Sequence, residues 1–111
     1  MQSATSGSAS VYRFREYELD ERRLELRRGG EQIALQPRVL STILYFAKNQ
    51  GRLVTKQELL SGPWGGTIVS GGAISRVVRE IRRALGDNAK RPRILVTVRG
   101  VGYRFEPPAL G

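Results

Sequence analysis

Three arginines in the C-terminal half of the chain recur at the spacing of one helix face. Arg76, Arg79 and Arg83 lie three and four residues apart, and at about 100° per residue this spacing brings them together on one side of a helix. A row of guanidinium groups of this kind can bind a polyanion. On an isolated helix the same row would more often only be solvated, so the choice between the two interpretations depends on the rest of the chain.

The helix that carries these arginines is predicted over residues 70–86. Its opposite face is apolar and consists of Ile74, Val77, Val78, Ile81 and Leu85. Ser70 can accept a backbone N–H in the first turn, and Gly86 suits the left-handed conformation that often follows a helix. Both ends of this helix are therefore signalled by the sequence.

Basic residues are concentrated in the same part of the chain. The 111 residues include 19 Lys and Arg against 10 Asp and Glu, a net charge of +9. Residues 70–105 hold nine of the basic residues and two of the acids, which leaves +7 there and +2 in the remainder. This asymmetry predicts a polyanion-binding surface on a nearly neutral platform. Charge alone is equally compatible with RNA or with membrane phosphates.

The composition excludes several kinds of chemistry. The sequence has no cysteine and no histidine, which removes disulfides, thiol nucleophiles, Ser-His catalysis and the usual zinc ligands. Glu58 and Glu80 are isolated carboxylates, so we expect no enzyme, no metal and no cofactor. No apolar run approaches the roughly 18 residues of a membrane span, and the length suits one domain. These features predict a cytoplasmic domain.

Short strands are predicted for the first part of the chain. Residues 1–10 are rich in Ser, Ala and Gly and are interpreted as a disordered leader. Residues 11–35 alternate apolar and polar side chains, which is typical of three or four half-buried antiparallel strands, with a hairpin turn at Gly29-Gly30. A short helix over residues 21–28 is the alternative, and the alternation favours strands.

Two helices are predicted to follow the strands. Pro37 suits the first turn of a core helix that closes before Gly51, and its apolar residues are Val39, Leu40, Ile43, Leu44 and Ala47. After a brief strand at residues 53–54, Thr55 and Glu58 have the spacing of a capping box, which predicts the start of the second helix.

A loop is predicted between the second helix and the basic helix. Gly62-Pro63 stops the second helix, because proline disfavours the helical conformation in the residue before it. The loop extends to Val69. Trp64 lies within it and is expected to be buried rather than to bind a partner.

A hairpin is predicted after the basic helix. Residues 93–99 alternate as a strand, residues 100–102 supply a Gly-containing turn and residues 103–105 return as the partner strand. The side chains expected to face the core are Ile94, Val96 and Val98, and those expected on the outer face are Leu95, Thr97 and Arg99. Prolines end the strand, so the domain is predicted over residues 11–106, with residues 107–111 as a linker or tail.

The order of these elements and their motifs resemble a known family. Three predicted helices, the third of them basic, precede a hairpin with a Gly-rich tip, as in a winged helix-turn-helix. Residues 79–87 (Arg-Glu-Ile-Arg-Arg-Ala-Leu-Gly-Asp) and 97–105 (Thr-Val-Arg-Gly-Val-Gly-Tyr-Arg-Phe) closely resemble the OmpR/PhoB-type winged-helix DNA-binding domain. The resemblance covers about residues 12–105 and implies an α+β fold with an N-terminal antiparallel sheet, three helices and a C-terminal β-hairpin wing.

The resemblance implies sequence-specific binding of double-stranded DNA by a bacterial transcriptional regulator of the one-component or two-component kind. The third helix would lie in the major groove and the wing at the minor groove. The candidates for base contacts are Ser75, Arg76, Arg79 and Glu80, because arginine reads guanine and a carboxylate can accept from cytosine. The candidates for backbone or wing contacts are Arg82, Arg83, Thr97 and Arg99.

The resemblance also implies further partners. In this family the loop before the third helix meets RNA polymerase, and the matching residues are Pro63, Trp64, Gly65, Gly66 and Thr67. Gly62-Pro63 departs from the aliphatic residue usual at that point of the family. We expect a monomer in isolation and two copies on direct-repeat DNA.

The place of the domain in its parent protein has two interpretations. No receiver domain precedes the module in this sequence. The domain was either cut from a longer regulator, or it lies first in one and is followed by a sensory or membrane-spanning region, which would make the parent membrane-anchored.

Two other functions stay open as alternatives. The Gly-Pro-Trp-Gly-Gly loop at residues 62–66 suggests a winged-helix protein-interaction module, for example one that contacts RNA polymerase, with weak non-specific DNA binding. An RNA-binding domain is disfavoured, because no exposed aromatic stacking pair stands out in the basic third of the chain.

Overall fold

An antiparallel sheet of four short strands opens the domain. The computed structural model describes residues 11–65, 71–88 and 90–107. The strands are β2 (Val11–Phe14), β3 (Tyr17–Asp20), β4 (Glu25–Arg28) and β5 (Glu31–Ile33), in that spatial order. The alternation of residues 11–35 is thus confirmed as strands, and the alternative of a helix over residues 21–28 is wrong.

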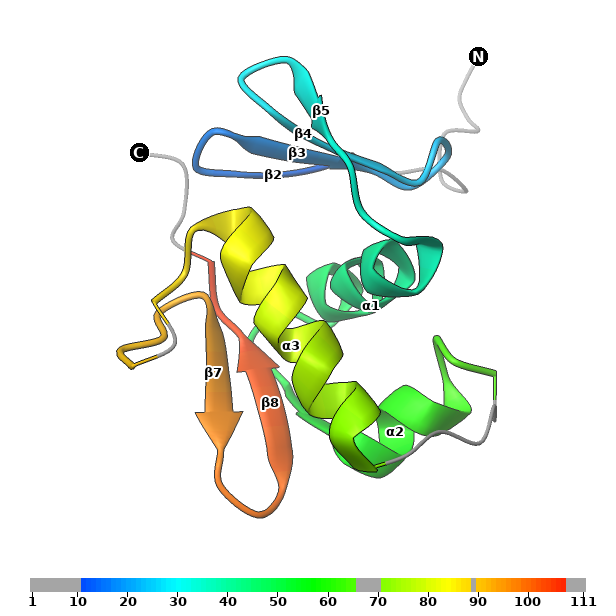
Figure 1. Ribbon diagram of the computed structural model, residues 1–111, viewed down its shortest axis with the longest axis vertical. Helices are drawn as coiled ribbons and strands as arrows, with labels where there is room; N and C mark the ends of the chain where they lie inside the picture. The colour runs from blue at the N-terminus through cyan, green and yellow to red at the C-terminus, as the bar shows by residue number, and fades with distance from the viewer. Residues whose placement is uncertain (1–10, 66–70, 89, 108–111) are drawn as a thin grey trace.

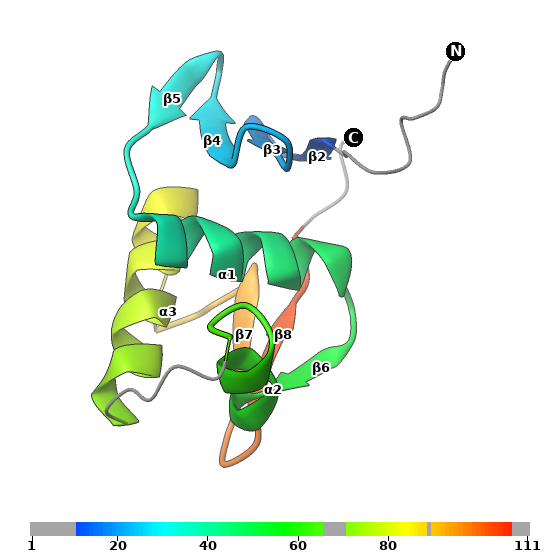
Figure 2. The same cartoon turned by 90° about the vertical axis from the view of Figure 1, so that its right-hand side faces the viewer.

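Three helices and a second sheet complete the part of the chain that the structure describes. The helices are α1 (Pro37–Lys48), α2 (Lys56–Ser61) and α3 (Gly71–Leu85). The strands β6 (Leu53–Thr55), β7 (Leu95–Val98) and β8 (Gly102–Phe105) form a three-stranded antiparallel sheet in the order β6-β8-β7. In Figure 1 the β7–β8 hairpin lies beside α3, and Figure 2 shows the four-stranded sheet covering α1.

Local signals set the helix bounds as expected. Pro37 occupies the first turn of α1, and the Thr55 side chain accepts the Glu58 N–H at 3.0 Å to close the capping box of α2. Gly86 follows α3 with a φ of 67°, which only glycine adopts without steric cost. Ser70, the residues of the predicted leader, and the predicted tail after Pro107 lie outside the described residues.

Aromatic rings join the layers of the core. The Phe105 ring of β8 lies 5.5 Å from the Phe14 ring of the first sheet and 6.1 Å from the Phe46 ring of α1. Phe46, which the sequence pattern did not single out, is fully buried, whereas the predicted core residue Leu44 is only partly buried. One core therefore holds both sheets and α1 together.

Trp64 is buried, as predicted, and it anchors the residues that follow α2. Its side chain is 4% exposed, and its Nε1–H donates to the Thr42 hydroxyl at 2.8 Å. The Arg38 guanidinium lies 5.0 Å from the centre of the ring, a distance that allows a cation–π contact. The indole N–H and the face of the ring thus each have a partner, the Thr42 hydroxyl and the Arg38 guanidinium.

The expected alternation of the hairpin is wrong at Leu95. This side chain was assigned to the outer face but is fully buried, next to buried Ile94, while Val96 and Val98 are only partly buried. The Asp87 carboxylate accepts backbone N–H groups from three successive residues, of which Leu95 is the last. The backbone bends around this carboxylate, so β7 begins only at Leu95, and the two neighbouring side chains both turn inward. Thr97 and Arg99 are exposed, as expected.

Gly102 is required where β6 and β8 meet. A Cβ atom there would lie 2.8 Å from the Thr55 Cα and would collide with the Val54 carbonyl oxygen. We predict that Gly102→Ala lowers the free energy of unfolding by at least about 2 kcal/mol, because the strands must separate to admit the methyl group. Urea denaturation measures this change. Gly72→Ala is the control, since a Cβ there meets nothing within 4 Å; an equal loss in both variants would contradict the proposed collision.

Glu58 makes the start of α2 sensitive to acid. The carboxylate accepts from the Arg52 guanidinium, from the Tyr45 hydroxyl at 2.5 Å and from the Thr55 backbone N–H at 3.4 Å. The Arg52 and then the Tyr45 hydrogen bonds lower the pKa of Glu58 from 4.5 to about 2. Because the folded-state pKa is depressed, the stabilisation is complete above pH 4.5 and is lost as the pH falls toward 2.

We predict that Glu58→Gln flattens the dependence of stability on pH in this range, since the amide does not titrate. The free energies of unfolding at pH 5 and pH 3 should differ less in the variant than in the wild type. Glu31→Gln, at an exposed side chain, is the matched control and should keep the wild-type difference. If Glu58→Gln also keeps that difference, the acid sensitivity does not come from Glu58.

Candidate nucleic-acid interface

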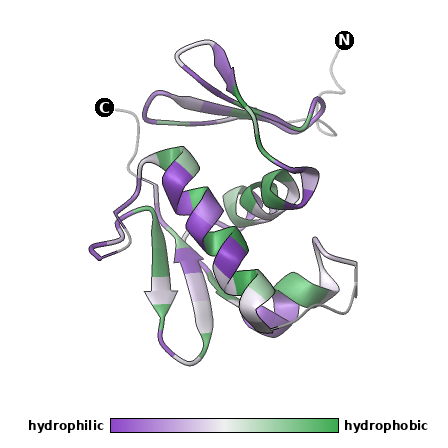
Figure 3. Ribbon diagram, in the orientation of Figure 1, coloured by the Kyte–Doolittle hydropathy of each residue, from purple (hydrophilic) through white to green (hydrophobic). Residues whose placement is uncertain are grey.

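The predicted row of arginines is exposed along α3. All five apolar residues of the opposite face are buried, and Ile81 and Leu85 are at most 1% exposed. Their burial turns Arg76, Arg79 and Arg83 outward, and all three are exposed. Figure 3 shows hydrophilic segments alternating with hydrophobic ones along α3.

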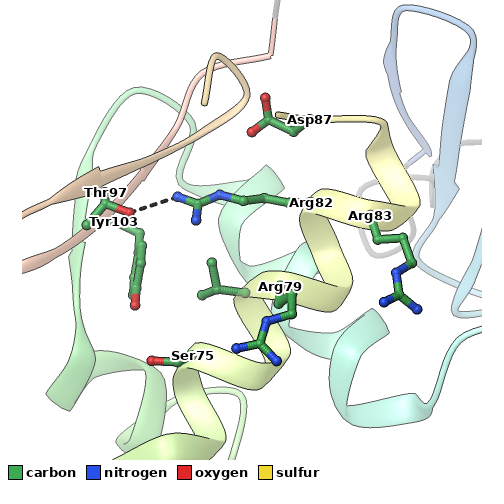
Figure 4. Close-up of a pocket in the computed structure, with 8 residues that line it drawn as sticks. Ser75, Arg79, Arg82, Arg83, Asp87, Thr97 and Tyr103 are labelled. Atoms are coloured by element: carbon green, nitrogen blue, oxygen red, sulfur yellow. Dashed lines mark hydrogen bonds between the residues drawn. The ribbon is translucent and has the colours of Figure 1, made fainter. Parts of the chain in front are cut away.

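A groove between α3 and the β7–β8 hairpin collects most of the predicted site. Its volume is about 440 Å³. The predicted residues that line it are Ser75, Arg79, Arg82, Arg83 and Thr97, and the others are Val78, Asp87 and Tyr103. Figure 4 shows Arg82 reaching from the helix toward Thr97, with Tyr103 on the same side, whereas Arg83 points away from the hairpin. Helix and hairpin residues that are 14 to 28 positions apart in the sequence meet here because α3 packs beside the hairpin.

Two predicted base-contact residues lie on another side of α3. Arg76 and Glu80 line a separate hollow of about 250 Å³, together with residues 34–36 and Val39 at the start of α1. Arg99, in the turn that follows β7, is exposed and lies outside both hollows. The predicted site therefore divides into a groove, a second side of the helix and the hairpin turn.

Arg82 and Thr97 bond to each other within the groove. The Arg82 guanidinium donates to the Thr97 hydroxyl at 2.8 Å and to the Leu95 carbonyl oxygen at 2.7 and 3.1 Å. Both residues were predicted phosphate contacts. In the structure, Nε and one terminal nitrogen of Arg82 are therefore already hydrogen-bonded to the hairpin.

The basic charges of this surface are not neutralised by ion pairs. Across residues 11–65, 71–88 and 90–107, none of the ion pairs includes Arg76, Arg79, Arg83 or Arg99. Most of the paired acids belong to the four-stranded sheet and its turns, for example Glu18 with Arg13 and Glu16 with Arg28. These four guanidinium groups therefore keep their charge available to a polyanion.

Sequence reasoning missed two groove residues. Tyr103 is 6% exposed and lines the groove from β8, and its place in the Gly-Tyr-Arg-Phe run was the available signal. Asp87, which holds the start of β7, was quoted only as part of a motif, and its position after the helix-ending Gly86 was its one local signal. Three polymerase-loop candidates are described: Pro63 is partly buried, Trp64 buried and Gly65 exposed, while Gly66 and Thr67 lie outside the described residues.

The part of the chain that the structure describes has no group of three or more Asp, Glu, His or Cys side chains placed to hold a metal ion. None of its helices is long and apolar enough to cross a membrane. The groove between α3 and the hairpin is lined instead by three arginines, Arg79, Arg82 and Arg83.

An antiparallel sheet, three helices and a hairpin beside a basic third helix together define a winged helix-turn-helix domain. The sequence family described as transcriptional regulatory protein, C terminal, matches residues 30–105. The chain belongs to this family of non-enzymatic DNA-binding domains of bacterial transcriptional regulators. The resemblance to OmpR/PhoB-type domains is thereby confirmed.

Curated relatives extend beyond the chain. It is 29% identical to the transcriptional activator CadC of Escherichia coli over 87 residues, which are 78% of this chain and 17% of CadC. It is 29% identical to KdpE of the same organism over 104 residues, 93% of this chain and 46% of KdpE. The KdpE of Mycobacterium tuberculosis is 35% identical over 71% of this chain and 35% of its own length. The chain thus spans less than half of these three relatives.

Solved structures agree with the fold. The RstA DNA-binding domain of Klebsiella pneumoniae, in complex with the RstA box, has a TM-score of 0.78 and 26% identity, covering 89% of this chain and 99% of that one. The response regulator DrrB of Thermotoga maritima, an OmpR/PhoB homologue, has a TM-score of 0.77 and 32% identity, covering 86% of this chain and 44% of DrrB.

Proposed function

We propose that the chain binds duplex DNA in a sequence-specific manner, with α3 in the major groove and the β7–β8 hairpin at the adjacent minor groove. The observation that carries this proposal is the groove between α3 and the hairpin, which Ser75, Arg79, Arg83 and Thr97 line. An α-helix fits the width of the B-DNA major groove, and arginine forms bidentate pairs with guanine there.

Within this proposal the exposed side chains contact different parts of the duplex. Arg79 and Ser75 contact bases from the hairpin side of α3, and Arg76 and Glu80 contact bases from the other side. Arg83 binds a backbone phosphate by its charge. Arg99 enters the minor groove, where a narrow A-rich segment attracts a guanidinium.

RNA polymerase is the second partner that we propose, at residues 63–67. The support is the anchoring of Trp64 by Thr42 and Arg38, which holds Pro63 and exposed Gly65 on a fixed support. In the same proposal residues 11–106 form a cytoplasmic, nucleoid-associated domain of a transcriptional regulator. The domain is a monomer alone and binds direct-repeat DNA as two copies about one helical turn apart.

Salt dependence tests the electrostatic part of the proposal. If one domain makes roughly four phosphate contacts, the plot of log K against log salt should have a slope near −3 to −4. Fluorescence titration of a duplex at several salt concentrations measures this slope. A slope near zero, or no detectable binding at low salt, would refute the proposal.

Reversal of the charges of Arg79 and Arg83 should abolish DNA binding, whereas a module that binds only proteins would keep its function.

Substitutions in the helix and in the wing should change DNA binding in different ways. We predict that Arg79→Ala flattens the preference at one base position, because one bidentate pair contributes about 1–3 kcal/mol of discrimination. Arg99→Ala should weaken many sites together, since A·T and T·A present nearly the same acceptors in the minor groove. A selected site and a panel of its single-base variants, measured at one salt concentration, separate the two patterns.

Arg22→Ala is the matched control for these variants, because Arg22 is an exposed arginine in the turn between β3 and β4. It should bind all sites as the wild type does. Equal loss of base discrimination in Arg79→Ala and Arg99→Ala would contradict the proposed division of labour.

A further inference from the structure

Arg82 differs from the other arginines of α3 because its guanidinium turns toward the hairpin. It is partly buried, whereas Arg79 and Arg83 are exposed. Figure 4 shows Arg82 reaching across the groove to Thr97 while Arg83 points away from the hairpin. Its Nε and one terminal nitrogen share the Leu95 carbonyl oxygen, and that terminal nitrogen also reaches the Thr97 hydroxyl.

These bonds tie an open sheet edge to α3. β7 is an edge strand, paired only with β8 in the order β6-β8-β7, so its outer backbone groups have no strand partner. The Leu95 carbonyl oxygen receives Arg82, and the Leu95 N–H donates to the Asp87 carboxylate at 2.9 Å. Both backbone groups of Leu95 are thus bound by residues in or directly after α3. These two contacts connect α3 and the segment that follows it to the edge of the hairpin.

The same bond directs the Thr97 hydroxyl. A threonine hydroxyl has one proton to donate and accepts through its lone pairs. Because the oxygen accepts from Arg82 at 2.8 Å, its own proton is left for another acceptor. Thr97 is exposed and lines the groove, so this proton is open to an acceptor on a molecule bound in the groove.

We propose that Arg82 is a positioning residue for DNA binding and not itself a phosphate ligand. It holds the hairpin at the separation from α3 that lets both reach the duplex, and it turns the Thr97 hydroxyl proton toward a phosphate. This inference rests on the proposed DNA-binding mode. It assigns different roles to two adjacent arginines that the sequence alone does not distinguish.

Lysine substitutions separate the two roles. A lysine can bind a phosphate as a point charge, but it lacks the planar fork that serves two acceptors. Arg82→Lys should therefore weaken binding to a selected duplex about tenfold, as expected for the loss of a hydrogen bond from a charged group. Arg22→Lys, at an exposed arginine in the turn between β3 and β4, is the matched control and should bind as the wild type does. Thermal unfolding of both variants identifies a temperature at which each is folded for the titrations.

A variant with its wing contacts removed provides a second measurement. In a Thr97→Val, Arg99→Ala background, Arg82→Lys should cause a smaller loss of DNA affinity, because the wing contacts that Arg82 positions are already absent. Amide hydrogen exchange at Leu95 and Val96 of the free protein should accelerate in Arg82→Lys, because the lysine no longer ties this edge of the hairpin to α3.

Three results would overturn the inference: wild-type affinity of Arg82→Lys, a loss that stays fully additive in the wing-deficient background, or unchanged amide exchange. Failure of the wild type to bind any duplex would instead refute the proposed function. In that case the amide-exchange measurement still tests whether Arg82 holds the hairpin.

Discussion

The burial of the apolar face of α3 is the constraint on which the rest of the structure depends. Val77, Ile81 and Leu85 are each at most 8% exposed, and each buried aliphatic side chain contributes about 1.5–3 kcal/mol. A rotation of α3 about its axis would expose these residues and drive guanidinium groups into an apolar core, which is costly. The same contacts that stabilise the core therefore also orient the arginine-bearing side of the helix.

The hairpin is held in two ways, and both are needed to form the groove. From within, Phe105 packs against Phe14 and Phe46, which attaches β8 to the common core. At the edge, Asp87 and Arg82 bind the backbone of Leu95. Because an edge strand has no partner on one side, such side-chain contacts both stabilise β7 and prevent pairing with another chain.

Charge is distributed between the two halves of the domain according to their roles. On the four-stranded sheet and its turns, arginines and glutamates pair with each other, so that surface stays close to neutral. On α3 the exposed arginines have few acidic neighbours along the chain, and Glu80 lies on the side away from the groove. A neutral platform beside a basic face orients the molecule toward a polyanion as it approaches.

Local signals in the sequence determined the helices and the arginine row. Pro37, the Thr55–Glu58 pair and Gly86 act within one turn of backbone, and three-four spacing assigns a face without knowledge of any partner. Only the tertiary structure decided that Arg82 binds the hairpin while Arg83 does not, that Arg76 and Glu80 lie apart from the groove, and that Leu95 is buried. Those outcomes depend on how closely segments distant in sequence pack, and no local pattern encodes that distance.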